Sequence, residues 1–161
     1  MRKTAHAAVA PVLLLAAATA DAAGAPGPVP YPEGYRSWHH VKSMVIQPGH
    51  PLADPFAGIH HVYADRGAVE GLRTGRYPEG AVLVFDLLEA RHADHAVTEG
   101  PRKLLGVMVR DSAARETGGW RFEAFRGSSR TERLVQDGGR ACFACHRQAS
   151  GSGFVFSRLR D

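Results

Sequence analysis

Two cysteines and a histidine near the C-terminal end form the pattern with the clearest chemistry in this sequence. The chain contains two cysteines, and both lie in the pentapeptide Cys142-Phe143-Ala144-Cys145-His146. This Cys-x-x-Cys-His spacing is the attachment motif of c-type haem. Two thiols would add to the two vinyl groups of one porphyrin, and the histidine would offer a neutral ring nitrogen to the iron. The motif therefore predicts one covalent haem c per chain, bound by Cys142, Cys145 and His146, with His146 as the iron ligand.

Three other interpretations of the cysteine pair stay open at the level of residues. An oxidising compartment would favour a short-range disulfide. A thioredoxin-like redox pair needs a strand–helix setting near the start of a domain, and half of a zinc site needs a second ligand pair nearby. The cysteines lie near the C-terminal end, and no second ligand pair lies close to them in sequence. Haem attachment is therefore the favoured interpretation.

The second axial ligand of the predicted haem decides its chemistry. Electron-carrier cytochromes c usually have a methionine downstream of the motif, but only 15 residues follow His146 and none is methionine. Met108 lies upstream in an apolar segment, where we expect it to fill the core. His60 and His61 lie on a predicted strand, where neighbours face opposite sides, so one of them would point inward. We expect the sixth position of the iron to be vacant or weakly occupied.

The elements that must position these residues are short, and most are strands. Two-residue alternation or apolar runs predict strands over residues 56–64, 81–88, 104–111 and 120–125. Three- to four-residue spacing and end signals predict helices over residues 31–41, 68–74 and most of 131–148. The polar residues 91–102 are predicted to form a surface loop. Four strands without a strand–helix alternation indicate a single small α+β domain, mainly antiparallel β, with few short helices.

The first 30 residues carry export signals. Arg2 and Lys3 precede an apolar run over residues 7–20, and small residues suited to signal peptidase follow it. We expect a signal peptide over residues 1–22, a linker over 23–30 and a haem domain over 31–161, which predicts a periplasmic protein. An uncleaved membrane anchor is the alternative, but the run is shorter than the about 20 apolar residues that span a bilayer.

The distribution of charge argues against one class of partner. The chain has a formal net charge of +4, and its basic residues are interspersed with acidic ones along the sequence. Nucleic-acid-binding domains gather basic side chains on one face or segment. We therefore expect no nucleic-acid partner.

Together with the haem motif, several short blocks resemble the cytochrome P-460 family in their order and spacing. The blocks are YPEGYRSW (residues 31–38), GIHHVY (58–63), GRYPEGA (75–81), GW (119–120) and FVFSR (154–158). The resemblance covers the chain from about residue 31 to the C-terminus. It implies a mainly β haem fold with a five-coordinate iron, and a homodimer.

The resemblance also implies one of two activities. In one branch of the family, a lysine on the strand after the Pro-x-Gly turn is cross-linked to the porphyrin, and the protein oxidises hydroxylamine. In the cytochrome c′-beta branch, phenylalanines cap the distal face and the protein binds nitric oxide. Phe85 aligns with the lysine and has no nucleophilic atom, and Phe56 aligns with the other distal phenylalanine. The chain is therefore more similar to the c′-beta branch, with Phe56, Phe85, His60 and His61 as distal-pocket candidates.

These features predict an exported mono-haem cytochrome c that binds a small diatomic ligand, nitric oxide first, at a five-coordinate iron. An apolar distal face offers no donor to the polar iron–dioxygen unit, whereas nitric oxide binds ferrous iron with little distal help. The alternatives are a hydroxylamine-oxidising haem enzyme and an electron-transfer cytochrome c with a redox partner protein. The residues alone assign no catalytic side chain.

Overall fold

The core of the structure is one antiparallel sheet. A computed structural model describes residues 27–160, and the predicted signal peptide, residues 1–22, lies outside them. Five strands pair in their sequence order. They are β1 His39–Ile46, β2 Gly58–Ala64, β3 Val82–Ala93, β4 Ala96–Arg110 and β5 Trp120–Arg126. The predicted α+β, mainly antiparallel β fold is confirmed.

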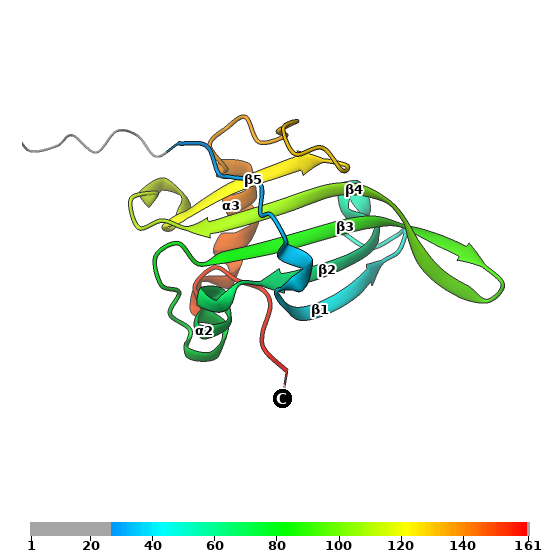
Figure 1. The fold of residues 1–161 in the computed structure, drawn as a ribbon, viewed down its shortest axis with the longest axis horizontal. Helices are drawn as coiled ribbons and strands as arrows, with labels where there is room; N and C mark the ends of the chain where they lie inside the picture. The colour runs from blue at the N-terminus through cyan, green and yellow to red at the C-terminus, as the bar shows by residue number, and fades with distance from the viewer. Residues whose placement is uncertain (1–26, 161) are drawn as a thin grey trace, which may run out of the picture.

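The helical segments are short and lie around this sheet. They are η1 Tyr35–Ser37, α1 Ala53–Phe56, α2 Arg66–Thr74, η2 Arg115–Thr117, α3 Arg140–His146 and η3 Arg147–Ser152. Figure 1 shows α3 behind the sheet and the N-terminal segment with η1 in front of it. The predicted helix before Gly75 is present as α2, and Gly75 ends it with a φ of 77°. No helix within residues 27–160 has the length and apolar character needed to cross a membrane.

The sheet separates two hydrophobic cores. The side covered by α2 and α3, here called the helix face, has a core that includes Val62, Leu83, Met108, Trp120 and Phe122. On the opposite side, here called the N-terminal face, the core comprises Val29, Tyr35, Val84, Leu105, Val107 and Phe125. Because both faces of β3 are covered, its first half is almost continuously apolar. Met108 is buried as predicted, and Val29, assigned from the sequence to the linker, belongs to the packed domain.

The predicted helix over residues 31–41 is wrong. Only the single turn η1 forms there, and β1 begins two residues after it. β1 pairs with β2, with His40 opposite Tyr63, so the backbone hydrogen bonds of this segment go to the sheet. The three- to four-residue spacing of aromatic residues arises because Tyr35 and Trp38 both pack against the N-terminal face. Tertiary packing therefore overrides the helical pattern.

The predicted surface loop over residues 91–102 is also wrong. This segment forms the ends of β3 and β4, which pair down to Ala93 and Ala96. The turn between them holds Asp94 and His95 at φ of 49° and 60°, which is typical of a tight two-residue hairpin. Figure 1 shows this hairpin projecting from one end of the molecule. Its side chains are mostly exposed, which explains the polar composition that indicated a loop.

Candidate functional site

The Cys-x-x-Cys-His motif lies on α3, and a tight turn sets the start of this helix. The Asp137 carboxylate accepts hydrogen bonds from the backbone N–H groups of Gly139 (2.9 Å) and Ala141 (2.7 Å). These bonds hold the pKa of Asp137 below its usual value. Gly139 has a φ of 87° and precedes the first helical residue. The predicted helix over residues 131–148 is therefore wrong in its first half, because the chain turns here.

The two thiols lie almost one helical turn apart. Cys142 and Cys145 are three residues apart on α3, and residues at this spacing are neighbours on one side of a helix. Both are free thiols, with Cys142 half-buried and Cys145 exposed. Burial raises the pKa of the Cys142 thiol. Cys142 packs against the core of the helix face, so the motif is directed towards the sheet.

The imidazole of His146 is held in one orientation. Its Nδ1 lies 2.8 Å from the backbone oxygen of Phe154. Because a carbonyl only accepts hydrogen bonds, Nδ1 carries the proton and Nε2 keeps a free lone pair. The ring packs between Phe122 and Phe156, at centroid distances of 5.1 Å and 5.3 Å. Burial lowers the pKa of His146, although the bond to Phe154 opposes this shift. A neutral imidazole anchored through Nδ1 is the form that ligates a metal.

Hydrogen bonds also fix the turn that contains the Phe154 carbonyl. Ser152 donates a hydrogen bond to the oxygen of Val155 at 2.7 Å, and the buried Trp120 donates from Nε1 to the oxygen of Gly153 at 2.9 Å. Sequence reasoning missed this support, because a backbone carbonyl leaves no signature in residue types. The turn before α3 was recognisable, since Asp-Gly-Gly is a typical turn sequence.

Three of the four distal candidates lie together on the helix face. Val62 on β2 and Gly106 on β4 flank Phe85 in the sheet register. The Phe56 ring meets the Phe85 ring edge-on, with 5.8 Å between the ring centroids. The centroid of the His60 ring lies 4.6 Å from that of Phe85. Phe85 and Cys142 pack against the same core. We call Phe56, Phe85 and His60 the aromatic cluster.

His60 is the polar member of this cluster, and it is buried. Only 3% of the residue's surface is exposed to solvent. Burial, with smaller contributions from the charges of Lys42 and His61, lowers the pKa of His60 to about 4. The imidazole is therefore neutral near pH 7. Its Nδ1 is buried and has no hydrogen-bond partner among residues 27–160.

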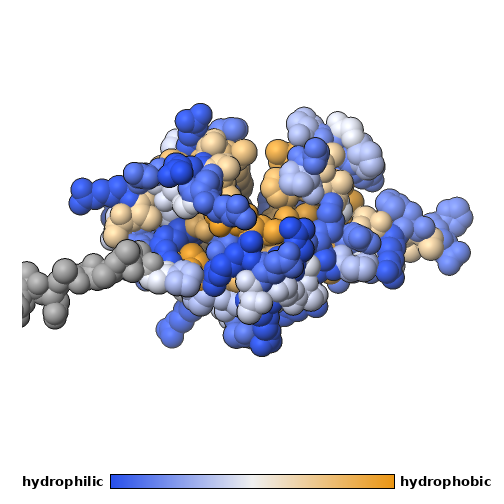
Figure 2. Space-filling model, turned by 90° about the horizontal axis from the view of Figure 1, so that it is seen from above, coloured by the Kyte–Doolittle hydropathy of each residue, from blue (hydrophilic) through white to orange (hydrophobic). Residues whose placement is uncertain are grey.

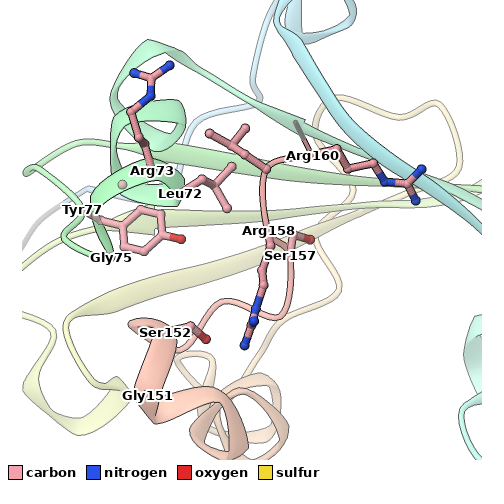
Figure 3. Close-up of a pocket in the computed structure, with 11 residues that line it drawn as sticks. Leu72, Arg73, Gly75, Tyr77, Gly151, Ser152, Ser157, Arg158 and Arg160 are labelled. Atoms are coloured by element: carbon pink, nitrogen blue, oxygen red, sulfur yellow. The ribbon is translucent and has the colours of Figure 1, made fainter.

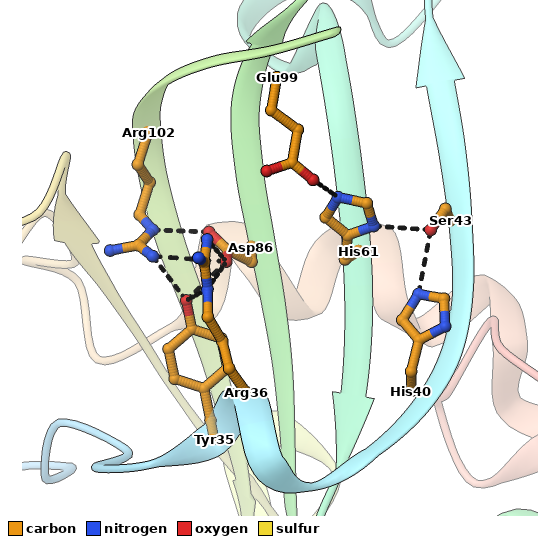
Figure 4. Close-up of polar contacts among 8 residues, drawn as sticks. All are labelled: Tyr35, Arg36, His40, Ser43, His61, Asp86, Glu99 and Arg102. Atoms are coloured by element: carbon orange, nitrogen blue, oxygen red, sulfur yellow. Dashed lines mark hydrogen bonds and ion pairs between the residues drawn. The ribbon is translucent and has the colours of Figure 1, made fainter.

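His61 does not belong to this pocket, which corrects its assignment as a distal candidate. Its Nδ1 lies 2.6 Å from the Ser43 hydroxyl, and its Nε2 lies 2.7 Å from the Glu99 carboxylate. Figure 4 shows this chain of contacts, which His40 extends through Ser43. Successive side chains of a strand point to opposite faces, so the neighbour of His60 lies on the other side of the sheet.

The surface is hollowed where an apolar cofactor could lie. Figure 2 shows a notch between two raised parts of the molecule, and its floor is apolar. A separate cavity of about 560 Å³ lies between α2 and the C-terminal segment, lined by residues that include Arg73, Tyr77, Arg158 and Arg160. Figure 3 shows the Tyr77 hydroxyl pointing into that cavity, while the guanidinium groups of Arg73 and Arg160 point away. That cavity contains none of the motif residues.

The residues of the site fit a covalently attached porphyrin. Two neighbouring free thiols, a neutral imidazole with a free Nε2 and an apolar aromatic cluster are the groups that such a cofactor needs. Within residues 27–160, no group of three or more His, Cys, Asp or Glu side chains is placed to hold a metal ion.

Comparison with known proteins bears on the same cofactor. The family model described as cytochrome P460 matches residues 32–157, which include α3 and the aromatic cluster. None of the curated proteins matches this chain.

Proposed function

The chain belongs to the cytochrome P460 family, and we propose that it is an exported mono-haem cytochrome c that binds nitric oxide. The family supports a haem-binding cytochrome with iron. Nitric oxide as the ligand is supported by Phe85, which aligns with the cross-linking lysine of the hydroxylamine-oxidising branch and lies in the aromatic cluster. Export rests on residues 1–22, and a homodimer rests on the family resemblance.

Three residues of α3 hold the haem in this proposal. Cys142 and Cys145 form the two thioether bonds, and His146 provides Nε2 as the protein's ligand to iron. The haem supplies an iron with one open position for a small diatomic ligand. The Phe154 carbonyl keeps the His146 ring in a single orientation, which limits the reorganisation needed for ligation.

The aromatic cluster supports selection of an apolar ligand. The ring of Phe85 is edge-packed by Phe56, and neither ring can donate a hydrogen bond. A polar ligand buried against these rings would lose its bonds to water, at a cost of about 1–3 kcal/mol for each unpaired group. The polar iron–dioxygen unit would find no donor on these rings, whereas nitric oxide binds ferrous iron with little distal help, so the two phenyl rings favour nitric oxide over dioxygen.

Hydroxylamine oxidation is the second candidate function, and Phe85 argues against it. In the related enzymes, a lysine at this position forms the cross-link to the porphyrin. A phenyl ring has no nucleophilic atom with which to form that bond.

Absorption spectra and ligand binding test the proposal. We expect the purified ferric and ferrous proteins to show high-spin, five-coordinate spectra, and the ferrous protein to bind nitric oxide readily and dioxygen poorly. Hydroxylamine should not sustain reduction of an artificial electron acceptor. Phe85→Lys is the matched variant, because it restores the nucleophile at the same backbone position. A low-spin, six-coordinate resting spectrum, or sustained hydroxylamine turnover by the unaltered protein, would contradict the proposal.

A further inference from the structure

The buried imidazole of His60 has a hydrogen-bonding capacity that the fold does not use. Its Nδ1 is buried without a partner among residues 27–160, on a residue 3% exposed. Leaving a buried polar atom unpaired destabilises a fold. Fully buried polar groups in native proteins usually have a partner. An unpaired atom beside a ligand pocket is therefore a candidate contact for a ligand.

Phe85 lies directly against this imidazole. Phe85 pairs with Val62 across β2 and β3, and His60 lies two residues from Val62 on the same face. The two rings are 4.6 Å apart and tilted by 41°. Phe56 approaches Phe85 from the α1 side. The ring of Phe85 therefore covers the imidazole within the aromatic cluster.

The strand position opposite Phe85 carries no side chain. Gly106 lies opposite Phe85 on β4, so no side chain fills the neighbouring position. A methyl group there would lie 3.5 Å from Cβ and 3.7 Å from Cδ1 of Phe85. These are ordinary contact distances, so an alanine would fit at Gly106 while closing the free space beside the ring.

We propose that His60 is a latent hydrogen-bonding residue of the ligand site, and that the Phe85 ring separates its imidazole from the bound ligand in the unaltered protein. This inference rests on the proposed function and deepens it. With the ring in place, the ligand meets an apolar surface and nitric oxide is favoured. When the ring is removed, the neutral imidazole can donate a hydrogen bond to a ligand that becomes polar on binding iron, of which dioxygen is the simplest.

A double-mutant cycle tests this arrangement. The haem-loaded ferrous protein and its Phe85→Ala, His60→Leu and doubly substituted variants are compared by their dioxygen dissociation rates and by the C–O stretching frequency of their carbon monoxide complexes. We expect Phe85→Ala to slow dioxygen dissociation about tenfold, the size of one net hydrogen bond. It should also lower the C–O frequency. His60→Leu should abolish both changes in the Phe85→Ala background and have little effect alone.

Three further variants keep the test specific. Phe56→Ala removes a distal ring but leaves Phe85 over His60, so it should not reproduce the Phe85→Ala effect. Gly106→Ala fills the position beside the Phe85 ring, so its dioxygen dissociation rate and C–O frequency should equal those of the unaltered protein. His60→Gln keeps an N–H donor and should retain part of the gain in the Phe85→Ala background.

Two outcomes would overturn the inference. One is equal dioxygen dissociation from Phe85→Ala and the doubly substituted variant. The other is a change caused by His60→Leu alone that is as large as that caused by Phe85→Ala. Failure of the proposed function is recognised separately, because the unaltered ferrous protein would then be six-coordinate or would not bind nitric oxide.

Discussion

His60 and His146 both lie on the helix face and both have a lowered pKa, but their surroundings suit them to different tasks. His146 donates through Nδ1 to the Phe154 carbonyl and lies between two aromatic rings. His60 has one ring neighbour at 4.6 Å and an unpaired Nδ1. A side chain that ligates iron needs a fixed orientation. A side chain that hydrogen-bonds to a bound small molecule needs a ring nitrogen without another partner.

The cysteines allow a direct test of covalent attachment. The purified protein should keep its haem through denaturing electrophoresis, as seen by a haem peroxidase stain. A variant carrying both Cys142→Ala and Cys145→Ala should lose its haem to acid-acetone extraction, because only His146 would still hold it. Each single variant should retain one thioether bond and therefore a stained band. Retention of haem by the double variant after extraction would refute covalent attachment.

The position of α3 depends on close packing at its first turn. Gly139 precedes the helix, and a Cβ at this position would lie 2.9 Å from the Cβ of Phe122 on β5. Phe122 also packs against the His146 ring. Any side chain at Gly139 would therefore push α3, and His146 with it, away from the sheet.

Two adjacent glycines separate this steric effect from backbone strain. Gly138 and Gly139 have φ of 70° and 87°, and nothing lies within 4 Å of a Cβ built on Gly138. Gly138→Ala should lower the free energy of unfolding by about 1–2 kcal/mol through its positive φ alone. Gly139→Ala should cost about 1–3 kcal/mol more through overpacking. Denaturant unfolding of the haem-loaded proteins measures both, and equal losses would show that contact with Phe122 is unimportant.

At the scale of the molecule, a buried carboxylate joins the N-terminal segment to the sheet. Asp86 on β3 is fully buried. It accepts hydrogen bonds from Tyr35 (2.5 Å), Arg36 (3.0 Å) and Arg102 (2.6 Å), as Figure 4 shows. Burial alone would raise the pKa of Asp86, but these bonds outweigh it and lower the pKa. The cluster holds η1 against β3 and β4, on the face opposite the haem motif.

Asp86→Asn should destabilise the protein by about 3 kcal/mol at pH 7, because two arginines lose their buried counter-charge. A lowered pKa contributes stability above the pKa of the unfolded chain, about 3.9, and that stability is lost as the pH falls through the folded pKa. The difference between the two proteins should therefore shrink below about pH 4. Denaturant unfolding at several pH values measures it.

Glu70→Gln is the matched control, because Glu70 pairs with Arg73 on the exposed surface of α2. Exposed pairs contribute about 0–1 kcal/mol, so this variant should unfold almost as the unaltered protein does at every pH. A loss for Asp86→Asn no larger than that for Glu70→Gln would show that the buried cluster does not stabilise the fold.

Much of the fold could be predicted because its signals are local. Apolar alternation located β2 and β5, an apolar run located β3, and the end signal at Gly75 located the end of α2. The failures were at β1, at the β3–β4 hairpin and in the segment before α3, where the chain turns and does not form a helix. β1 is an edge strand stabilised by its pairing with β2, and the hairpin has few buried side chains to reveal it.

The residue types by themselves predicted haem attachment at the Cys-x-x-Cys-His motif and determined that Phe85 has no nucleophilic atom, because bonding to a porphyrin depends on which atoms a side chain has. Only the tertiary structure decided that His60, and not His61, shares the face of Phe85. Strand alternation places the two histidines on opposite faces, but the register of β2 with β3 determines which face each one occupies. The tertiary structure also decided that a backbone carbonyl orients His146 and that Phe85 covers His60. The contact of His146 with Phe154 spans 8 residues across a turn, and the contact of Phe85 with His60 joins two strands, so neither follows from residue types alone.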